Sequence, residues 1–363
     1  MFATSKKLRL RQSVGIVASG GVIEFFKSNT RNSLVLRMRP DGVINFLQQF
    51  DGSRSIADIS SMHPELDIKD IINFLETLRS AHILIEQNSE YPIHLKNEDY
   101  RLLNILEEYF HSTSEVIEAV ERIKNSTVMI TGLGAVGSYV ALYLAKIGVR
   151  SFVLVDADNV EISNLHRQAY FEADLCHQKA ERLMSRIKEI NSDSSITTIS
   201  DRLSDDFFDK HKITSNLDLI INCADEPSVD YTSRIISSYA MEHGIPHIVG
   251  GGYNLHLTLI GQTIIPFKTA CFKCFEIALQ NINGIEFSNL KRLDRANRKL
   301  GSFSPLSGIA ASLASLDAFK ILSGAHEYLQ QSNKRIEFNV KQRKFVTIDI
   351  ERQPSCPWCG SIK

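Results

Sequence analysis

The sequence predicts an α/β protein built on a Rossmann-like, mostly parallel sheet with helices on both faces. Two observations predict this class. From residue 127 onward, short apolar runs typical of strands alternate with amphipathic runs typical of helices, and this order favours βα units and a parallel sheet. The first strand pattern is followed directly by Gly132-Leu-Gly134-Ala-Val-Gly137, where a helix pattern begins.

Strands and helices are expected to alternate along this region, within a domain that spans 126–363. The expected strands are Thr127–Thr131, Ser151–Val155, Ile196–Ile199, Leu217–Asn222 and His247–Val249. The expected helices are Val136–Ile147, Gln178–Asn191 and Val229–His243. A charged helical connector, 93–125, is expected to precede the domain that spans 126–363.

The first 92 residues follow another pattern and are expected to form a small separate domain, with its boundary near Pro92. Two β-type runs, Val14–Ala18 and Val22–Phe26, flank Ser19-Gly20-Gly21, which is typical of a hairpin. A third strand is expected at Leu34–Met38, and three helical patterns follow. Three strands followed by three helices predict a winged-helix-like α+β module.

The composition excludes several function classes. Lys and Arg total 41 and Asp and Glu total 42, so the net charge of −1 gives no electrostatic reason to expect nucleic acid or an anionic membrane as a partner. No apolar segment of a secretory signal follows the basic N-terminus. The longest apolar stretch, Leu306–Leu322, is interrupted by Asp317. A cytoplasmic protein is therefore expected.

The glycine-rich turn between a strand and a helix favours phosphate binding. Glycines let the backbone approach a phosphate, and the helix N-terminus offers free N–H donors. Asp156 ends the next strand, where a carboxylate can accept hydrogen bonds from a ribose. By themselves these features indicate a nucleotide, with NAD or a simple packing turn as open alternatives.

The residues after Asp156 change the expectation from a dinucleotide to ATP. Cationic donors follow the strand and open the next helix, where they could neutralise the charge that moves onto departing pyrophosphate. Asp225 ends a later strand and could bind Mg²⁺. Each of these residues alone would also fit a solvated surface. The candidate residues of the phosphate region are Asp158, Asn164, Arg167, Gln168 and Lys179.

With these motifs in this order, the stretch from Val128 to the C-terminus resembles the E1-like superfamily of adenylating enzymes, which includes the ThiF, MoeB and HesA proteins. The resemblance implies that the glycine loop binds ATP, Asp156 holds the ribose, Asn164, Arg167, Gln168 and Lys179 contact the phosphates, and Asp225 binds Mg²⁺. It implies a reaction in which a carboxylate oxygen joins the α-phosphorus and pyrophosphate leaves.

An arginine of the partner subunit often completes such sites in that superfamily. The nearest match to its motif here is Tyr100-Arg101-Leu-Leu-Asn, which departs from the family pattern. Arg101 is the resulting candidate, and a homodimer with two equivalent sites is expected from the resemblance.

Four cysteines form two pairs, Cys271-Phe-Lys-Cys274 and Cys356-Pro-Trp-Cys359. Two such pairs can supply four thiolates in a tetrahedron, which is the closed form of a structural Zn²⁺ site. A redox pair and two unconnected pairs are the alternatives. The E1-like superfamily has two pairs in the same places, which implies one zinc site that joins the C-terminus to the domain.

Ubiquitin-type activators need a cysteine nucleophile after the first zinc pair, and Phe275–Phe303 contains none. A thioester relay is therefore not expected. Cys223 fits a small buried hydrophobic residue, and Cys176 is expected in a loop. Gly250–Asn254 follows a strand and could border the acyl group, although a plain loop is equally compatible with it.

Activators of sulfur-carrier proteins usually lack an N-terminal module of this size. Here the stretch Phe50–Ile56, followed by Ile83-Leu-Ile85, resembles PqqD-type domains that recognise precursor peptides. Such domains capture a leader peptide as an added strand. A module that only supports dimerisation is the alternative.

Together, both halves resemble the peptide-modifying branch of the superfamily, which includes MccB of microcin C maturation and PaaA of the pantocin A pathway. The implied function is ATP- and Mg²⁺-dependent adenylation of a carboxyl group of a ribosomally synthesised precursor peptide, in peptide-antibiotic biosynthesis. An intramolecular nucleophile would then displace AMP. The alternative is adenylation of the C-terminal glycine of a sulfur-carrier or ubiquitin-like protein.

Overall fold

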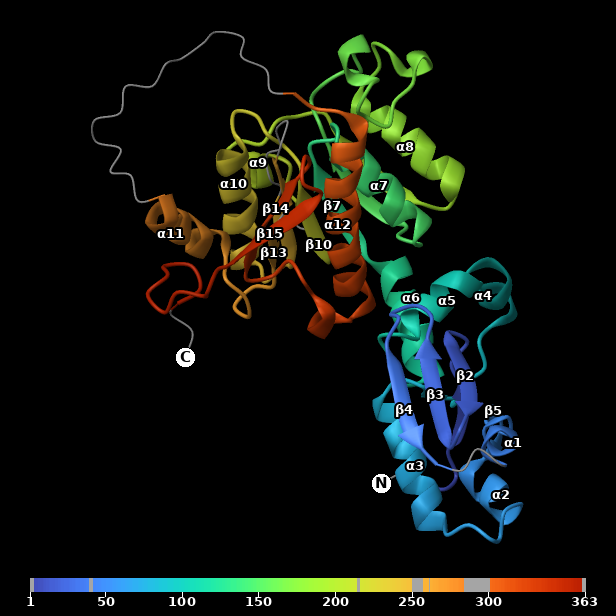
Figure 1. The fold of residues 1–363 in the computed structure, drawn as a ribbon. Coiled ribbons are helices and arrows are strands. Elements are labelled where there is room, and N and C mark those ends of the chain that lie inside the picture. Colours follow the sequence, from blue (N-terminus) through green and yellow to red (C-terminus); the bar gives the residue numbers. More distant parts are fainter. Residues whose placement is uncertain are drawn as a thin grey trace. The chain divides into compact units, whose positions relative to one another are not determined.

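The computed structural model describes residues 3–38, 42–213, 216–249, 257–260, 262–283 and 301–360. The chain divides into two compact units, Met1–Glu121 and Arg122–Lys363. Figure 1 colours the first from blue to green and the second from green to red. The finer division into 1–92, 93–125 and 126–363 stays a prediction.

The N-terminal unit contains two small antiparallel sheets. One has the order β2 (Val14–Ser19), β3 (Val22–Lys27), β4 (Ser33–Arg37), and the other has the order β5 (Asp51–Ser55), β1 (Lys7–Leu10), β6 (Leu84–Glu86). The expected hairpin connects β2 to β3. Gly20 and Gly21 both have positive φ, 59° and 79°, which is the backbone that a two-residue turn between twisted strands requires.

The first three helices and the two sheets share one apolar core in this unit. The helices are α1 (Val43–Leu47), α2 (Ile56–Ser61), α3 (Ile68–Ser80), α4 (Ile93–Glu98), α5 (Tyr100–Leu106) and α6 (Thr113–Asn125), the last of which continues into the second unit. α3 shows why the sequence folds this way: Ile71, Leu75 and Leu78 recur at helical spacing and are buried against Leu8 of β1. The winged-helix-like description of this unit stays a prediction.

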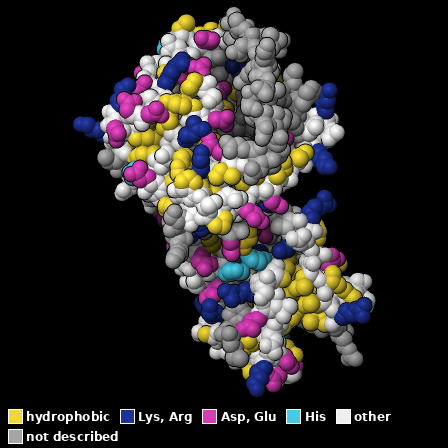
Figure 2. Space-filling model, turned by 90° about the vertical axis from the view of Figure 1, so that its left-hand side faces the viewer, with side chains coloured by type: hydrophobic (Ala, Val, Ile, Leu, Met, Phe, Trp, Pro, Cys, Tyr) yellow, Lys and Arg dark blue, Asp and Glu magenta, His cyan; other side chains and the backbone are white. Residues whose placement is uncertain are grey.

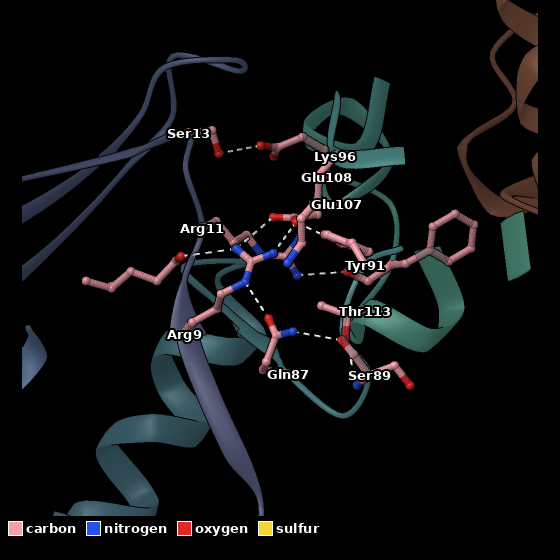
Figure 3. Close-up of polar contacts among 12 residues, drawn as sticks. Arg9, Arg11, Ser13, Gln87, Ser89, Tyr91, Lys96, Glu107, Glu108 and Thr113 are labelled. Carbon is pink, nitrogen blue, oxygen red and sulfur yellow. Dashed lines mark hydrogen bonds and ion pairs between the residues drawn. The ribbon is translucent and has the colours of Figure 1, made fainter. Parts of the chain in front are cut away.

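A polar network joins β1 to the residues that follow Pro92, and Figure 3 shows its side chains converging. The guanidinium of Arg9 forms an ion pair with the nearly buried carboxylate of Glu107, which also accepts a hydrogen bond of 2.8 Å from the Tyr91 hydroxyl. Arg11 is buried and donates to the backbone oxygen of Phe110 at 2.8 Å. Because removing one member of a buried pair is costly, these bonds explain why the compact unit extends past Pro92 to Glu121.

The C-terminal unit contains a six-stranded sheet of order β13-β11-β10-β7-β8-β9. Five strands are parallel, and β13 alone is antiparallel. The strands are β7 (Thr127–Thr131), β8 (Ser151–Val155), β9 (Ser195–Ile199), β10 (Leu219–Asn222), β11 (His247–Val249) and β13 (Gln262–Ile264). The α/β class with a mostly parallel sheet is thus confirmed.

Helices cover both faces of this sheet (Figure 1). α9 (Phe207–Lys210) and α10 (Val229–Glu242) lie on one side, and α7 (Gly137–Lys146), α8 (Lys179–Ile190) and α12 (Ser304–Ser323) lie on the other. α11 (Phe272–Asn283) follows β13. A separate antiparallel sheet has the order β12 (Leu257–Ile260), β14 (Lys334–Asn339), β15 (Lys344–Asp349).

α12 is long and apolar enough to span a membrane, but 67% of its apolar window is buried inside the unit. Its length and composition therefore reflect a core helix, which packs against α7. Asp317 interrupts the apolar run and is itself buried, and it accepts a hydrogen bond of 2.7 Å from Thr263. On the face drawn in Figure 2, acidic and basic side chains of the described residues are interspersed.

Candidate functional site

The glycine turn after β7 lies against the end of β10. Gly132 has φ 76°, and a Cβ placed there would lie 2.4 Å from the backbone nitrogen of Ala224. A Cβ on Gly137 would lie 2.0 Å from the Gly132 oxygen. Both positions therefore exclude every side chain. At Gly134 a Cβ would have only ordinary contact, 3.8 Å from the side chain of Gln168, so packing alone does not require this glycine.

Asp156 orients the glycine turn from the end of β8. One of its carboxylate oxygens accepts a hydrogen bond of 2.6 Å from the Leu133 N–H, and the other accepts one of 2.9 Å from the Asp158 N–H. Burial raises the pKa of Asp156, although the ammonium of Lys179, 3.8 Å away, acts against the rise. The carboxylate is thus held in one orientation at the mouth of the turn.

Lys179 opens α8 and is nearly buried. Its ammonium donates to the carboxylate of Asp158 at 2.9 Å. Burial of Asp158 acts to raise its pKa, but the hydrogen bonds and charges of Lys179 and Arg202 together outweigh this, and the pKa is lowered. Lys179 is therefore a fixed positive charge beside two carboxylates at the carboxyl ends of parallel strands, where ligands of such sheets bind.

A cavity of about 90 Å³ opens at this edge of the sheet. Asp225 and Glu226 line it from the end of β10, opposite Asp156 and Asp158. Asp225 is exposed at the rim, yet partial loss of solvent and then the charge of Glu226 raise its pKa. The side chains from β8 and β10 thus surround the glycine turn. A larger depression of about 1340 Å³ along α10 contains none of the predicted site residues.

Sequence reasoning did not identify Arg202, which also lines this cavity. Its guanidinium forms ion pairs with Asp158, at 3.3 Å, and with Glu226. These pairs are largely exposed, so each contributes little to stability and can open easily. The available signal in the sequence was the position of Arg202, three residues after the end of the expected strand Ile196–Ile199, at the edge of the sheet where the other candidates lie.

Three further candidates belong to the segment between β8 and α8. The Asn164 side chain accepts a hydrogen bond of 3.0 Å from the Glu161 N–H, and the Arg167 guanidinium donates to the Ser163 oxygen at 2.5 Å. Gln168 is buried, and its side-chain oxygen has no hydrogen-bond partner among the described residues. A buried polar atom without a partner is unusual and is compatible with a ligand contact.

The structure thus brings Gly132, Asp156, Asp158 and Asp225 to one cavity, with Lys179 paired to two of the carboxylates. Arg101 lies on α5 in the N-terminal unit and is exposed. Cys223 is not poised as a nucleophile, because burial raises the pKa of its thiol to about 12. Gly250–Asn254 and most of the segment 275–303 lie outside the described residues.

The four paired cysteines form a second candidate site. Cys271, Cys274, Cys356 and Cys359 are buried, and their sulfur atoms all lie within 4.8 Å of one another. Individual Sγ–Sγ distances are 3.8, 3.5 and 3.4 Å, close to the roughly 3.8 Å expected between sulfurs in tetrahedral zinc coordination. The cluster can therefore hold a metal ion, and it joins the C-terminal segment to the start of α11.

The comparisons with known proteins agree with this arrangement. The profile of the ThiF family matches residues 111–358. The sulfur carrier protein ThiS adenylyltransferase of Escherichia coli (strain K12) is 26% identical over 245 residues, which cover 67% of this chain and 90% of that protein. The molybdopterin-synthase adenylyltransferase of Salmonella typhimurium is 28% identical over 251 residues, covering 67% and 90%.

Solved structures resemble the chain over nearly its whole length. E. coli MccB with ATP has a TM-score of 0.77 at 24% identity and covers 97% of this chain and 99% of MccB. MccB with AMPCPP and MccA has a TM-score of 0.76 at 23% identity, with the same coverage. PaaA has a TM-score of 0.70 at 19% identity, covering 94% of this chain and 100% of PaaA. At these identities the likeness establishes a shared fold that includes the N-terminal unit.

We expect Cys359→Ser to remove the metal and destabilise the C-terminal unit, because three thiolates leave the coordination sphere open. Zinc measured by elemental analysis should fall well below one per chain, and the thermal midpoint should drop by about 5 °C or more. Cys176→Ser, at an exposed cysteine outside the cluster, is the matched control. Zinc content equal to that of the wild type in the Cys359 variant would refute the four-thiolate site.

Proposed function

The chain belongs to the ThiF family and is an E1-like ATP-dependent adenylyltransferase, and from this premise we propose that it activates a carboxyl group of a ribosomally synthesised precursor peptide. The observation that supports this substrate most is the N-terminal unit. The shared fold with MccB and PaaA extends over 97% and 94% of the chain and so includes this unit. MccB has been solved with the peptide MccA.

In the proposed reaction a carboxylate oxygen of the peptide bonds to the α-phosphorus of ATP, and the bond to the β-phosphate oxygen breaks to release pyrophosphate. The glycine turn offers its backbone to the phosphates and Asp156 accepts from the ribose hydroxyls. Lys179 and Arg167 provide the positive charge that stabilises departing pyrophosphate. Asn164 and Gln168 supply further polar contacts, and Gln168 has an acceptor still free among the described residues.

Asp225 is the proposed ligand of Mg²⁺. Its raised pKa, due to loss of solvent and to Glu226, means that the site disfavours its negative charge unless a cation is present. Bound Mg²⁺ would offset this charge and neutralise the phosphates. The proposal thus uses Asp225 for the metal and leaves Asp156 for the sugar.

After adenylation, an intramolecular nucleophile of the peptide would attack the activated carbonyl carbon and displace AMP. The sequence contains no cysteine between Phe275 and Phe303, and the Cys223 thiol is held protonated by burial. Direct transfer without a thioester on the enzyme is therefore the route that the residues support.

The N-terminal unit is proposed to act as a PqqD-like domain that binds the leader peptide. β2 and β4 each pair only with β3 in the described part of the unit, so both sheet edges have free backbone groups. Val17 and Val35 flank Glu24 in one register across this sheet and are 62% and 55% exposed. A peptide added as a strand would gain main-chain hydrogen bonds and cover such apolar side chains.

The relatives found by sequence support a second function as well as the solved structures support the first. The likenesses to the ThiS and molybdopterin-synthase adenylyltransferases favour adenylation of the C-terminal glycine of a sulfur-carrier protein. The chemistry of the ATP site is the same in both cases, so only the acyl substrate separates them.

Peptide-dependent exchange of pyrophosphate into ATP distinguishes the two substrates. With a precursor peptide encoded near this gene, we expect exchange that falls about tenfold or more when the leader half is removed, because the leader supplies binding energy distant from the carboxylate. A carrier protein that ends in Gly-Gly is tested in parallel. Exchange with the carrier protein but not with the peptide would move the chain to the sulfur-carrier function.

Asp225→Asn keeps the size of the side chain and removes its charge. We expect turnover to fall about a hundredfold or more because the metal loses its charged ligand, while the thermal midpoint stays within about 2 °C, since Asp225 is exposed. Asp193→Asn, at another exposed carboxylate, should leave turnover unchanged. Wild-type turnover in the Asp225 variant would show that the metal role is wrong.

Arg101 is proposed to reach the site of the partner subunit in a homodimer. Arg101→Ala and Lys179→Ala should each abolish exchange when present alone. After the two variants are mixed and allowed to exchange subunits, half of the dimers are mixed and each has one intact site, so about a quarter of wild-type activity should return. No recovery in dimers shown by mass spectrometry to be mixed would exclude this role for Arg101.

A further inference from the structure

Tyr170 contacts two parts of the ATP site at once. Its side chain is buried, and its hydroxyl donates a 2.9 Å hydrogen bond to the backbone oxygen of Leu133, inside the glycine turn. The same hydroxyl lies 3.4 Å from the backbone oxygen of Lys179, at the start of α8. The Tyr170 hydroxyl therefore links the glycine turn, which is proposed to bind the phosphates, to α8, which carries Lys179, the proposed cation of the phosphate site.

The two peptide groups that flank the Leu133 Cα are each fixed by a side chain. Its N–H donates to Asp156 at 2.6 Å, and the Leu133 oxygen accepts from Tyr170. Burial raises the pKa of Tyr170 well above its ordinary value, with the charges of Asp156 and Asp174 contributing in the same direction. The hydroxyl is thus a donor throughout the physiological range.

A second link runs beside the first. The Ala169 N–H donates to the Ser138 hydroxyl at 3.1 Å, and this hydroxyl donates to the Gly134 oxygen at 2.7 Å. Ser138 is fully buried. Residues 169 and 170 are therefore both hydrogen-bonded to the glycine turn. Ala169 is connected to Gly134 through the Ser138 hydroxyl, and Tyr170 donates directly to Leu133.

The segment that contains these residues is itself anchored to α8. Asp174 is fully buried and accepts from the Phe171 N–H at 2.9 Å, from Arg182 at 2.8 Å and from Arg186 at 2.6 Å. Such a satisfied, charge-assisted network holds the backbone around it rigidly. Tyr170 thus connects the glycine turn to a segment that Asp174 holds against α8.

We infer that Tyr170 is a positioning residue of the ATP site, whose hydroxyl sets the glycine turn relative to α8 and thereby increases the affinity for ATP. The residue does not need to touch the nucleotide. It acts through the Leu133 carbonyl, and preorganisation of this kind reduces the ordering that the ligand would otherwise impose. The inference rests on the proposed ATP contacts of the glycine turn but not on the identity of the acyl substrate.

Tyr170→Phe removes the hydroxyl and leaves the ring in place. With Mg²⁺ and ATP in the absence of peptide, calorimetry should give a Kd for ATP about three- to tenfold higher than in the wild type, the range that one hydrogen bond supplies. Tyr239→Phe is the matched control, because the Tyr239 hydroxyl also donates to a backbone oxygen, that of Ile213, at 2.6 Å. Tyr239 lines the depression along α10 and not the ATP cavity.

Thermal unfolding of both variants separates positioning from plain stabilisation. A positioning role predicts that both midpoints fall but that the Kd for ATP rises only in the Tyr170 variant. An unchanged Kd in a folded Tyr170→Phe protein overturns the inference. If that variant does not fold, Ser138→Ala tests the parallel link, and it should raise the Kd while an unchanged value would overturn the inference. Because no peptide is present, failure of the peptide-substrate proposal cannot produce either result.

Discussion

The close approach of the β7 turn to the end of β10 constrains the whole candidate nucleotide site. It is possible only because Gly132 and Gly137 lack Cβ atoms, which would lie 2.4 and 2.0 Å from neighbouring backbone. With the turn pressed against Ala224, the carboxyl ends of β7, β8 and β10 surround one small cavity. The charged residues at those strand ends then lie within reach of a single ligand, as expected for an open parallel sheet.

Because four carboxylates lie close together at this edge of the sheet, their negative charge must be compensated. Asp156, Asp158, Asp225 and Glu226 line one cavity, and Lys179 and Arg202 partly compensate them. The compensation is uneven: Lys179 is nearly buried beside Asp156 and Asp158, whereas the pairs of Arg202 are exposed. Asp225 has no such cation bonded to it among the described residues, and its pKa is raised. The side of the cavity near β10 is therefore the one that gains most from a bound cation.

The sequence predicted the sheet, the glycine turn and the strand-end carboxylates because each depends on local periodicity or on a motif of fixed spacing. β1 and β5 were not predicted. β1, Lys-Leu-Arg-Leu, is only four residues long, and β5, Asp-Gly-Ser-Arg-Ser, is polar, and both become strands by pairing with each other across 40 residues of chain. Arg202 escaped for a related reason. No motif contains it, and its role arises only when β8 and β10 lie on either side of β7.

Tyr170 is a further residue whose role could not be predicted from the sequence. In the sequence it is a single aromatic residue, two positions after Gln168, and it would be assigned to the apolar core. Its side chain is indeed buried. Its chemical significance lies in one oxygen atom that meets the Leu133 carbonyl, 37 residues earlier. A phenylalanine would fill the same volume, so apolar packing does not explain the hydroxyl. A buried hydroxyl destabilises the fold unless it has a hydrogen-bond partner, and here the partner is the carbonyl of Leu133, the residue whose N–H donates to Asp156. The physical reason for a tyrosine at this position is therefore the geometry of the glycine turn.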